Sequence, residues 1–252
     1  MNAANLVIVL PAFCAGLLVL ATHVPLGRLV LDRGIVFIDL AVAQVAGLGV
    51  VAADAAGFEG GWPVQAAALA AALTAALGLS VTEKRLGHLQ EAVIGVVFVA
   101  AASAEIVLLS FNPHGAEHLK DLLVGQILWV TFDQLWPVLI VYALVLLALW
   151  RIDVARRRFV FYGLFAVTVT VSVQLVGVFL VFASLIVPAL VVKVAARPRP
   201  LPIAYGVGLA GYVIGLVSSA WIDLPTGAAI VCALALVGLI AGLSFSFLRT
   251  PA

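Results

Sequence analysis

Residues 159–196 read FVFYGLFAVTVTVSVQLVGVFLVFASLIVPALVVKVAA, a run of 38 residues that is apolar almost throughout. A helix needs about 20 residues to cross the roughly 30 Å hydrocarbon core of a membrane, so this run is too long for one crossing. Basic residues occur at 156–158 before the run and within 193–199 at its end. If both ends lie on the cytoplasmic side, the chain crosses and returns, and we predict the turn near Gly177.

The composition of the whole chain also indicates a protein that lies in a membrane. The 252 residues are 65% hydrophobic and 10% charged, whereas soluble domains are about 45–50% apolar and about 25% charged. No linker or long polar segment interrupts this pattern. We therefore expect residues 1–252 to form one all-α domain, a polytopic transmembrane helical bundle in a lipid bilayer. The N-terminus lacks the basic region of a secretory signal, so the first run is expected to remain as a span.

The apolar runs predict eight or nine membrane spans. They fall near 5–22, 34–54, 62–81, 91–110, 135–150, 159–177, 178–196, 201–220 and 224–248. With the N-terminus outside and the C-terminus cytoplasmic, 12 of the 13 Lys and Arg residues fall on inner segments, as the positive-inside rule requires. Segment 119–132 is apolar but short, and we interpret it as an interfacial or re-entrant helix on the outer side.

The predicted outer segments carry six acidic residues and one lysine. Such a rim would raise the local concentration of cations. The excess of acidic residues has an equally good simple explanation, which is that basic residues are excluded from the outer side and acidic residues are not. The net charge of +1 provides no basic field for nucleic acid, so we expect no nucleic-acid partner.

Acidic side chains interrupt two of the apolar spans. The stretch GIVFIDLAVAQVAGLGVVA at 34–52 contains Asp39 and Gln44, and a later span contains Glu91 at its start and Glu105 near its end. Ionisable groups at membrane depth are costly and often mark ion paths, which makes Asp39 the leading candidate. We give equal weight to the alternative that Asp39 only forms a structural hydrogen bond to a neighbouring helix. Glu91 is expected to be exposed to solvent at the start of its helix. For Glu105, the alternative to a role in an ion path is that its side chain extends to the outer membrane interface.

The outer loop 111–121, FNPHGAEHLKD, offers two further metal ligands, His114 and His118. With Glu117 they reproduce the H-x-x-E-H order of one metallopeptidase class, but the proline and glycine of this loop predict a turn where that motif needs a regular helix. A weak outer site for a divalent cation and a plain solvated loop both remain open. The sequence has no G-x-x-x-x-G-K-[ST] motif, so we do not expect an enzyme that hydrolyses a nucleotide by that route.

Five stretches of the chain carry a resemblance to a known family. They are VPLGRLVLDRGIVFIDLAVAQVAGLG at 24–49, EKRLGHLQEAVIGVVF at 83–98, HLKDLLVGQILWVT at 118–131, VGVFLVFASLIVPAL at 176–190 and DLPTGAAIV at 223–231. In this order they resemble the permease subunits of metal-type ABC importers, which serve zinc, manganese or iron. Each stretch alone is weak, and their order together with the span count makes the resemblance specific.

The resemblance implies a function and a set of partners. Such a permease forms a homodimer in the bacterial inner membrane, sits on two ATPase subunits and receives metal from an extracytoplasmic binding protein. A divalent metal, zinc or manganese, would be its transported substrate, with no permanently bound cofactor. The residues that we expect to contact the metal are Asp39, Gln44, Glu105, His114 and His118.

Three features of the sequence differ from the family pattern. The histidine that follows the family aspartate by four residues is Ala43 here, and Gln44 comes one residue later. The Gly-Asp of the short outer helix is Gly125-Gln126. Only RIDVARRR at 151–158 separates two spans where the family has a longer segment with an ATPase-docking helix. The short loop keeps a second hypothesis open, an ATP-independent carrier or an accessory membrane protein on the same scaffold.

Overall fold

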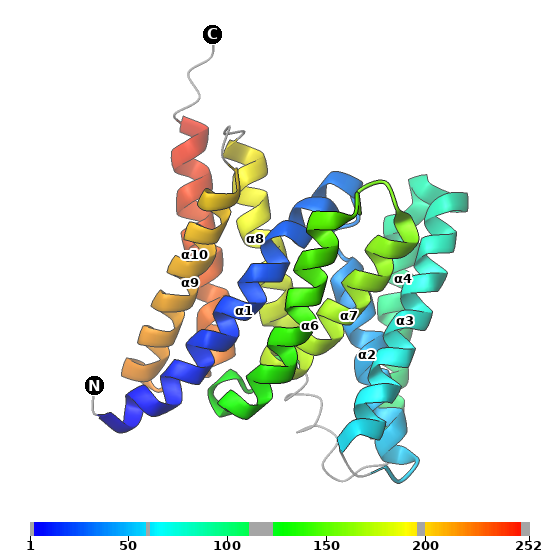
Figure 1. Cartoon of the computed structure of the whole chain (residues 1–252), viewed down its shortest axis with the longest axis horizontal. Coiled ribbons are helices and arrows are strands. Elements are labelled where there is room, and N and C mark those ends of the chain that lie inside the picture. The colour runs from blue at the N-terminus through cyan, green and yellow to red at the C-terminus, as the bar shows by residue number, and fades with distance from the viewer. Residues whose placement is uncertain (1–2, 59–60, 111–122, 196–199, 248–252) are drawn as a thin grey trace.

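The structure is a computed structural model that describes residues 3–58, 61–110, 123–195 and 200–247 (Figure 1). Within these ranges the chain is all-α, with nine long helices that run alternately in opposite directions. They are α1 (Ala3–Arg33), α2 (Ile38–Ala55), α3 (Gly61–Leu86), α4 (Gln90–Leu109), α6 (Phe132–Arg151), α7 (Arg158–Val176), α8 (Val178–Ala195), α9 (Pro200–Ile222) and α10 (Thr226–Phe247). The 3-10 turn η1 (Gly87–Leu89) separates α3 from α4, and a second, η2 (Ile127–Trp129), precedes α6.

The apolar run 159–196 folds as the two helices α7 and α8, which meet at Gly177 as predicted. Gly177 has a φ of +80°, a left-handed conformation that is costly for a residue with a Cβ. Its backbone also packs directly against that of Gly125, so a Cβ at Gly177 would overlap the backbone there. Glycine is therefore needed at this position for two independent reasons.

Eight helical stretches in the described part of the chain are long and apolar enough to cross a membrane. One of them, Gly61–Leu109, is divided at η1 into α3 and α4, and both of these helices pack against α2. The prediction of a polytopic helical membrane bundle with eight or nine spans is confirmed.

The first helix is longer than the sequence predicted. We expected a span over 5–22 and an inner loop over 23–33, but α1 continues to Arg33. His23 and Leu26 in its second half are fully buried, because this half packs closely on α8. A helix of 31 residues is about 46 Å long, more than the hydrocarbon core, and tilting accommodates the excess. Figure 1 shows α1 running obliquely across the bundle.

The segment before α6 packs into the bundle without crossing it. It contains η2 and lies where α7, α8 and α10 meet. A Cβ at Gly125 would overlap the backbone of Val176, and one at Gly227 would overlap the carbonyl oxygen of Val124. These close approaches agree with a re-entrant segment. Of the helix expected over 119–132, residues 119–122 lie outside the described ranges, Leu123 and Val124 are α-helical, and the 3-10 turn η2 follows at 127–129.

Small residues set the closest contacts between other helices as well. Gly49 of α2 packs against Ala68 and Ala71 of α3, and Gly215 of α9 packs against Ile230 of α10. In lipid, apolar contact alone does not hold helices together, so such close backbone approach contributes directly to association.

All five tryptophans are exposed and lie near the ends of helices or in η2. They are Trp62, Trp129, Trp136, Trp150 and Trp221. Tryptophan is enriched at the two interfaces of a membrane. The apolar face of α6 between its two tryptophans is largely exposed, as expected of a helix in contact with lipid.

The two ends of the bundle differ in charge. We call the end at which α1, α3, α6 and α8 finish the Arg33 end, and the end at which α2, α4, α7 and α9 finish the Asp54 end. All nine Lys and Arg residues of the described ranges lie within about two helical turns of the Arg33 end. Helix α1 begins at the Asp54 end and α10 finishes at the Arg33 end (Figure 1).

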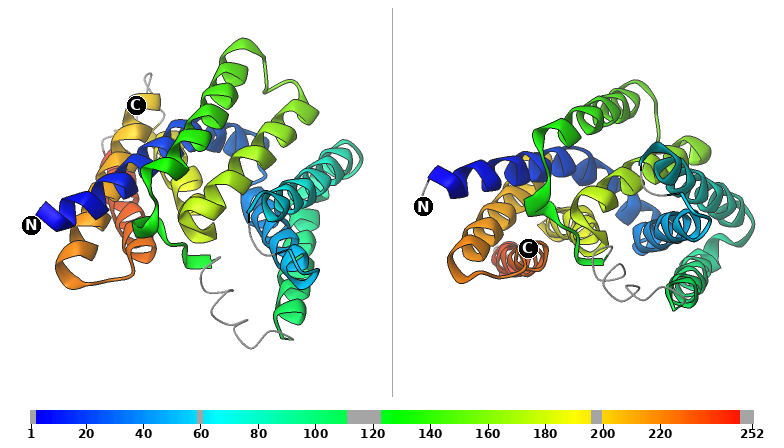
Figure 2. Two further views of the ribbon diagram at one scale, coloured as in Figure 1. Left: turned by 60° about the horizontal axis from the view of Figure 1, so that its bottom comes forward. Right: turned by 90° about the horizontal axis from the view of Figure 1, so that it is seen from below.

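The helices form two groups, which Figure 2 shows side by side. Helices α2, α3 and α4 pack with one another, and α2 and α3 also contact α7. Helices α1, α8, α9 and α10 form the second group, and α6 lies outside against α1 and α7. The first group, together with α6 and α7, lines a cavity at the Asp54 end.

Candidate metal path

A cavity of about 800 Å³ lies at the Asp54 end of the bundle. Its walls come from α2, α3, α4, α6 and α7, together with the segment 125–130. Most of the lining is apolar, with valines from four of these helices. Its polar lining consists of one carboxylate and four amides, from Asp54, Gln65, Gln126, Gln134 and Gln174, and all five residues are exposed to solvent.

Backbone geometry places Gln126 at this cavity. Gly125 has a φ of +70° and lies against the α7–α8 junction, so the chain turns there and leaves Gln126 exposed on the cavity wall. The side chain of Gln134 is already engaged, because the Thr131 backbone N–H donates to its Oε1 at 3.0 Å in a capping box at the start of α6. Gln126 is therefore freer than Gln134 to contact a solute in the cavity.

Glu105 lies deeper, on α4, and is 1% exposed. One of its carboxylate oxygens is packed against Gly47 of α2, where a Cβ would overlap it. The other oxygen, Oε2, has no hydrogen-bond partner among the described residues. Glu105 therefore does not reach the outer interface, which was the alternative that the sequence left open.

Gln44 is 4% exposed and lies three residues before Gly47, so the two share a side of α2. This places an amide on the side of α2 against which the Glu105 carboxylate packs. The five-residue spacing from Asp39 to Gln44 persists in a regular helix, which keeps these two side chains on different faces.

Asp39 occupies the first turn of α2 and is 1% exposed. Neither of its oxygens bonds to a neighbouring helix in the described ranges. It precedes Gly47 by eight residues, or about 12 Å along the axis, so Asp39 and Glu105 lie at different depths. The start of a helix favours a negative charge, which offsets part of the cost of burying this carboxylate.

The other predicted ligands, His114 and His118, lie outside the described residues. Within the described ranges, no three His, Cys, Asp or Glu side chains come together as a metal cluster. The candidate residues thus form successive polar positions at different depths, and their contact with a metal stays a prediction.

Several polar positions were not singled out from the sequence. Gln65 and Gln174 interrupt apolar spans in the same way as Gln44, which is a signal that could have found them. Glu91 was expected to be solvated, but its carboxylate is partly buried and accepts a hydrogen bond from the Val36 backbone N–H in the turn between α1 and α2. No local pattern in the sequence could have predicted that contact.

Comparison with known proteins matches this chain to one transport family and to membrane proteins of metal transport systems. The family model described as the ABC 3 transport family matches residues 5–153 and 149–244. The manganese transport system membrane protein MntC of Listeria innocua is 28% identical over 190 residues, which cover 67% of this chain and 68% of that protein. The chelated iron transport system membrane protein YfeD of Yersinia pestis is 30% identical over 173 residues, which cover 60% and 58%.

A solved structure resembles the whole fold. PsaBC from Streptococcus pneumoniae, in complex with Fab, matches with a TM-score of 0.75 over 93% of this chain and 90% of that chain. The sequence identity is 19%, so this likeness bears on the fold.

Proposed function

Because the chain belongs to the ABC 3 transport family, whose model matches almost its full length, we propose that it is the permease subunit of an ATP-driven importer of divalent metal. The permease forms the translocation path, and ATP is hydrolysed on a separate ATPase subunit. The relatives named for manganese and chelated iron transport support metal as the substrate class.

One observation supports this proposal most strongly, the series of oxygen-bearing side chains along α2. Asp54 lines the outer cavity, Glu105 packs against Gly47 about 10 Å further along the helix, and Asp39 lies about 12 Å beyond that. Buried carboxylates in a membrane protein are costly and typically mark an ion path. A cation that enters the cavity would meet a carboxylate at each of these depths.

The chemistry of these groups favours manganese over zinc. Carboxylate and carbonyl oxygens suit Mn²⁺, whereas imidazole and thiolate suit Zn²⁺. The described polar lining of the cavity consists of amides and one carboxylate. Within the pair of metals that the sequence suggested, we therefore propose manganese.

The charge distribution supports an orientation. The basic residues at the Arg33 end would lie on the cytoplasmic side of the bacterial inner membrane. The Asp54 end would then face outward and receive metal from an extracytoplasmic binding protein. As in the family, two copies of the permease would assemble on two ATPase subunits.

A second function, ATP-independent transport, rests on the loop between α6 and α7. Only six residues, 152–157, separate these helices, which leaves no room for a separate docking helix.

Manganese accumulation in cells separates the two functions. Cells that express the permease with its ATPase and binding protein should accumulate manganese, and cells that lack the ATPase alone should not. Equal accumulation in both would favour the ATP-independent carrier.

A further inference from the structure

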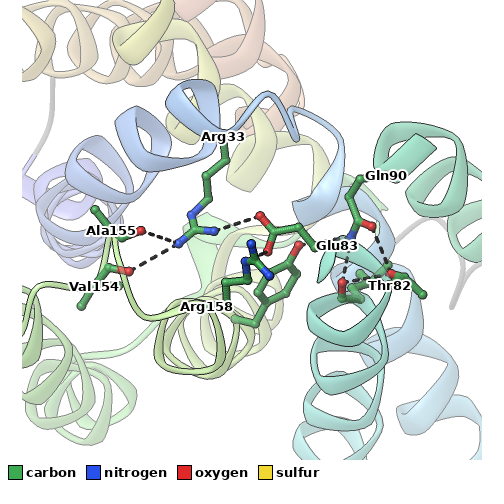
Figure 3. Close-up of polar contacts among 9 residues, drawn as sticks. Arg33, Thr82, Glu83, Gln90, Val154, Ala155 and Arg158 are labelled. Atoms are coloured by element: carbon green, nitrogen blue, oxygen red, sulfur yellow. Dashed lines mark hydrogen bonds and ion pairs between the residues drawn. The ribbon is translucent and has the colours of Figure 1, made fainter. Parts of the chain in front are cut away.

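At the Arg33 end, a cluster of two arginines and Glu83 of α3 holds the loop between α6 and α7 (Figure 3). The guanidinium of Arg33 donates to the carbonyl oxygen of Ala155 at 2.8 Å and approaches that of Val154 at 3.5 Å. Arg33 also donates to Oε1 of Glu83 at 3.0 Å, and Oε2 of Glu83 lies 3.7 Å from the guanidinium of Arg158. The side chains of Arg33 and Glu83 are only 12% and 15% exposed. The loop is therefore fixed through its backbone, and the charges of Arg33 and Glu83 neutralise each other.

Three other arginines around this loop, Arg151, Arg156 and Arg157, are exposed. Arg156 lies 3.1 Å from Asp153, the one acid among residues 150–159. Arg151 and Arg157 form no ion pair with any residue that the structure describes. The exposed side of the loop therefore carries a positive charge that the described part of the chain does not neutralise.

Arg151 lies at the end of a stripe of apolar side chains on α6. Ile140, Leu144 and Leu147 are 62%, 61% and 48% exposed, and they precede Arg151 by eleven, seven and four residues. Side chains at these spacings lie on one side of a helix. The stripe is about 16 Å long, which is close to half of the roughly 30 Å hydrocarbon core and hence to the depth of one lipid leaflet. One acyl chain fits along it.

Trp150 places the end of this stripe at the level of the lipid headgroups. Its side chain is 77% exposed, and the guanidinium of Arg151 lies over its ring, 4.9 Å from the centre. Tryptophan is enriched at the membrane interface, and an arginine beside it extends its charge toward the headgroups. A phosphate group at this level would lie beside Arg151 and close to the loop, which begins one residue later.

We propose that one anionic phospholipid binds here, with its phosphate at Arg151 and Arg157 and an acyl chain along Ile140, Leu144 and Leu147. Each basic residue near the membrane surface favours anionic over neutral lipid, and the unpaired charges of the loop supply that preference. The apolar stripe identifies a lipid as the ligand, because a free anion or an acidic protein surface would make no use of it. The site requires only the membrane and is independent of the proposed function.

The end of α3 carries two basic residues in a contrasting setting. Arg85 and the preceding lysine are exposed at the same end of the bundle. The exposed residues that precede Arg85 by eleven, seven and four positions are Thr74, Gly78 and Val81. They form a small, partly polar surface at the spacings where α6 has isoleucine and two leucines, and tryptophan is absent from the second half of α3. Removing these two charges therefore lowers the charge of the Arg33 end but leaves the α6 stripe intact.

Fluorescence quenching at Trp150 tests the site. The full-length protein is placed in vesicles of phosphatidylcholine that contain a fraction of phosphatidylglycerol, and one of the two lipids carries brominated acyl chains, which quench tryptophan on contact. Subtracting the signal of W150F, which lacks only this tryptophan, isolates the quenching of Trp150. We expect phosphatidylglycerol to be favoured over phosphatidylcholine at Trp150 by at least about fivefold.

Variants at exposed positions separate a lipid site from a general effect of charge. R151Q/R157Q should remove most of the preference, R151K/R157K should retain it, and K84Q/R85Q should match wild type. Equal quenching by both brominated lipids in the wild type would overturn the proposal. An equal loss of preference in K84Q/R85Q would also overturn it, because the preference would then come from the charge of the whole Arg33 end. If inorganic phosphate abolished the preference and chloride at the same ionic strength did not, the ligand would be a free anion, which would contradict a lipid site.

Discussion

The Glu105 carboxylate of α4 lies against Gly47 of α2, at a point where any side chain on α2 would overlap it. The contact places a buried acid against the helix that carries the other polar candidates. The absence of a side chain at Gly47 is what leaves room for that acid.

The first prediction concerns this contact. G47A should fold, because the atom displaced is the end of a flexible side chain, but it should reduce metal uptake by about tenfold by moving the carboxylate. G95A on α4 is the matched control, since a Cβ there meets nothing within 4 Å and should change stability by less than about 1 kcal/mol. Uptake and thermal unfolding of both variants check the prediction. If G47A transported as well as G95A, the position of the carboxylate would not matter.

The buried carboxylates themselves can be neutralised with little change in shape. E105Q and D39N should each lower uptake by about tenfold or more while leaving the unfolding temperature unchanged or raised, because a buried charge without a partner is costly. Normal expression with wild-type uptake would reduce the residue concerned to a packing role. A variant that unfolds, but whose folded fraction takes up metal at the wild-type rate, would also show that the residue has only a packing role.

The cavity at the Asp54 end offers a gain-of-function test. Q126D replaces an amide by a carboxylate and should lower the manganese concentration for half-maximal uptake by about threefold to tenfold, since ligand charge tunes affinity for such cations. Q134E adds the same charge to the cavity wall at a side chain held by the Thr131 N–H, and its effect should be smaller. Equal effects would indicate a general influence of charge, without direct contact at Gln126.

The α7–α8 junction makes a prediction about stability. G177A combines a left-handed φ of +80° with overlap of the Gly125 backbone, and it should cost at least about 2 kcal/mol or prevent assembly. G163A on α7 has open space around it and serves as the control. Unfolding of the two variants in detergent measures the difference, and equal stability would contradict the described packing of this junction.

Much of the fold was predictable because a membrane imposes strong constraints. The length of the 159–196 run and the basic residues at its ends were enough to predict a return at Gly177. The end of the first helix was not predictable in the same way. The apolar face of VPLGRLVLDR packs on α8, and this tertiary contact extends α1 over a segment whose charges suggested a loop.

The candidate site was predictable in its residue types and less so in its geometry. An acid or amide in an apolar span is visible in the sequence, which is why Asp39, Gln44 and Glu105 were singled out. Their depths, and the contact of Glu105 with Gly47, depend on how α2 and α4 pack. The cluster around Glu83 joins residues 50 and 75 positions apart in the chain, and no local pattern predicts such a contact.

Manganese transport out of proteoliposomes that contain the permease and its ATPase subunit, with the Arg33 end outside and accessible to added ATP, tests the central proposal most directly. Metal and binding protein are enclosed within the vesicles, and the loss of metal from the lumen is followed. We expect transport only when ATP is added, and none when the ATPase subunit is omitted. Transport at the same rate without ATP would contradict an ATP-driven importer and establish the chain as an independent carrier.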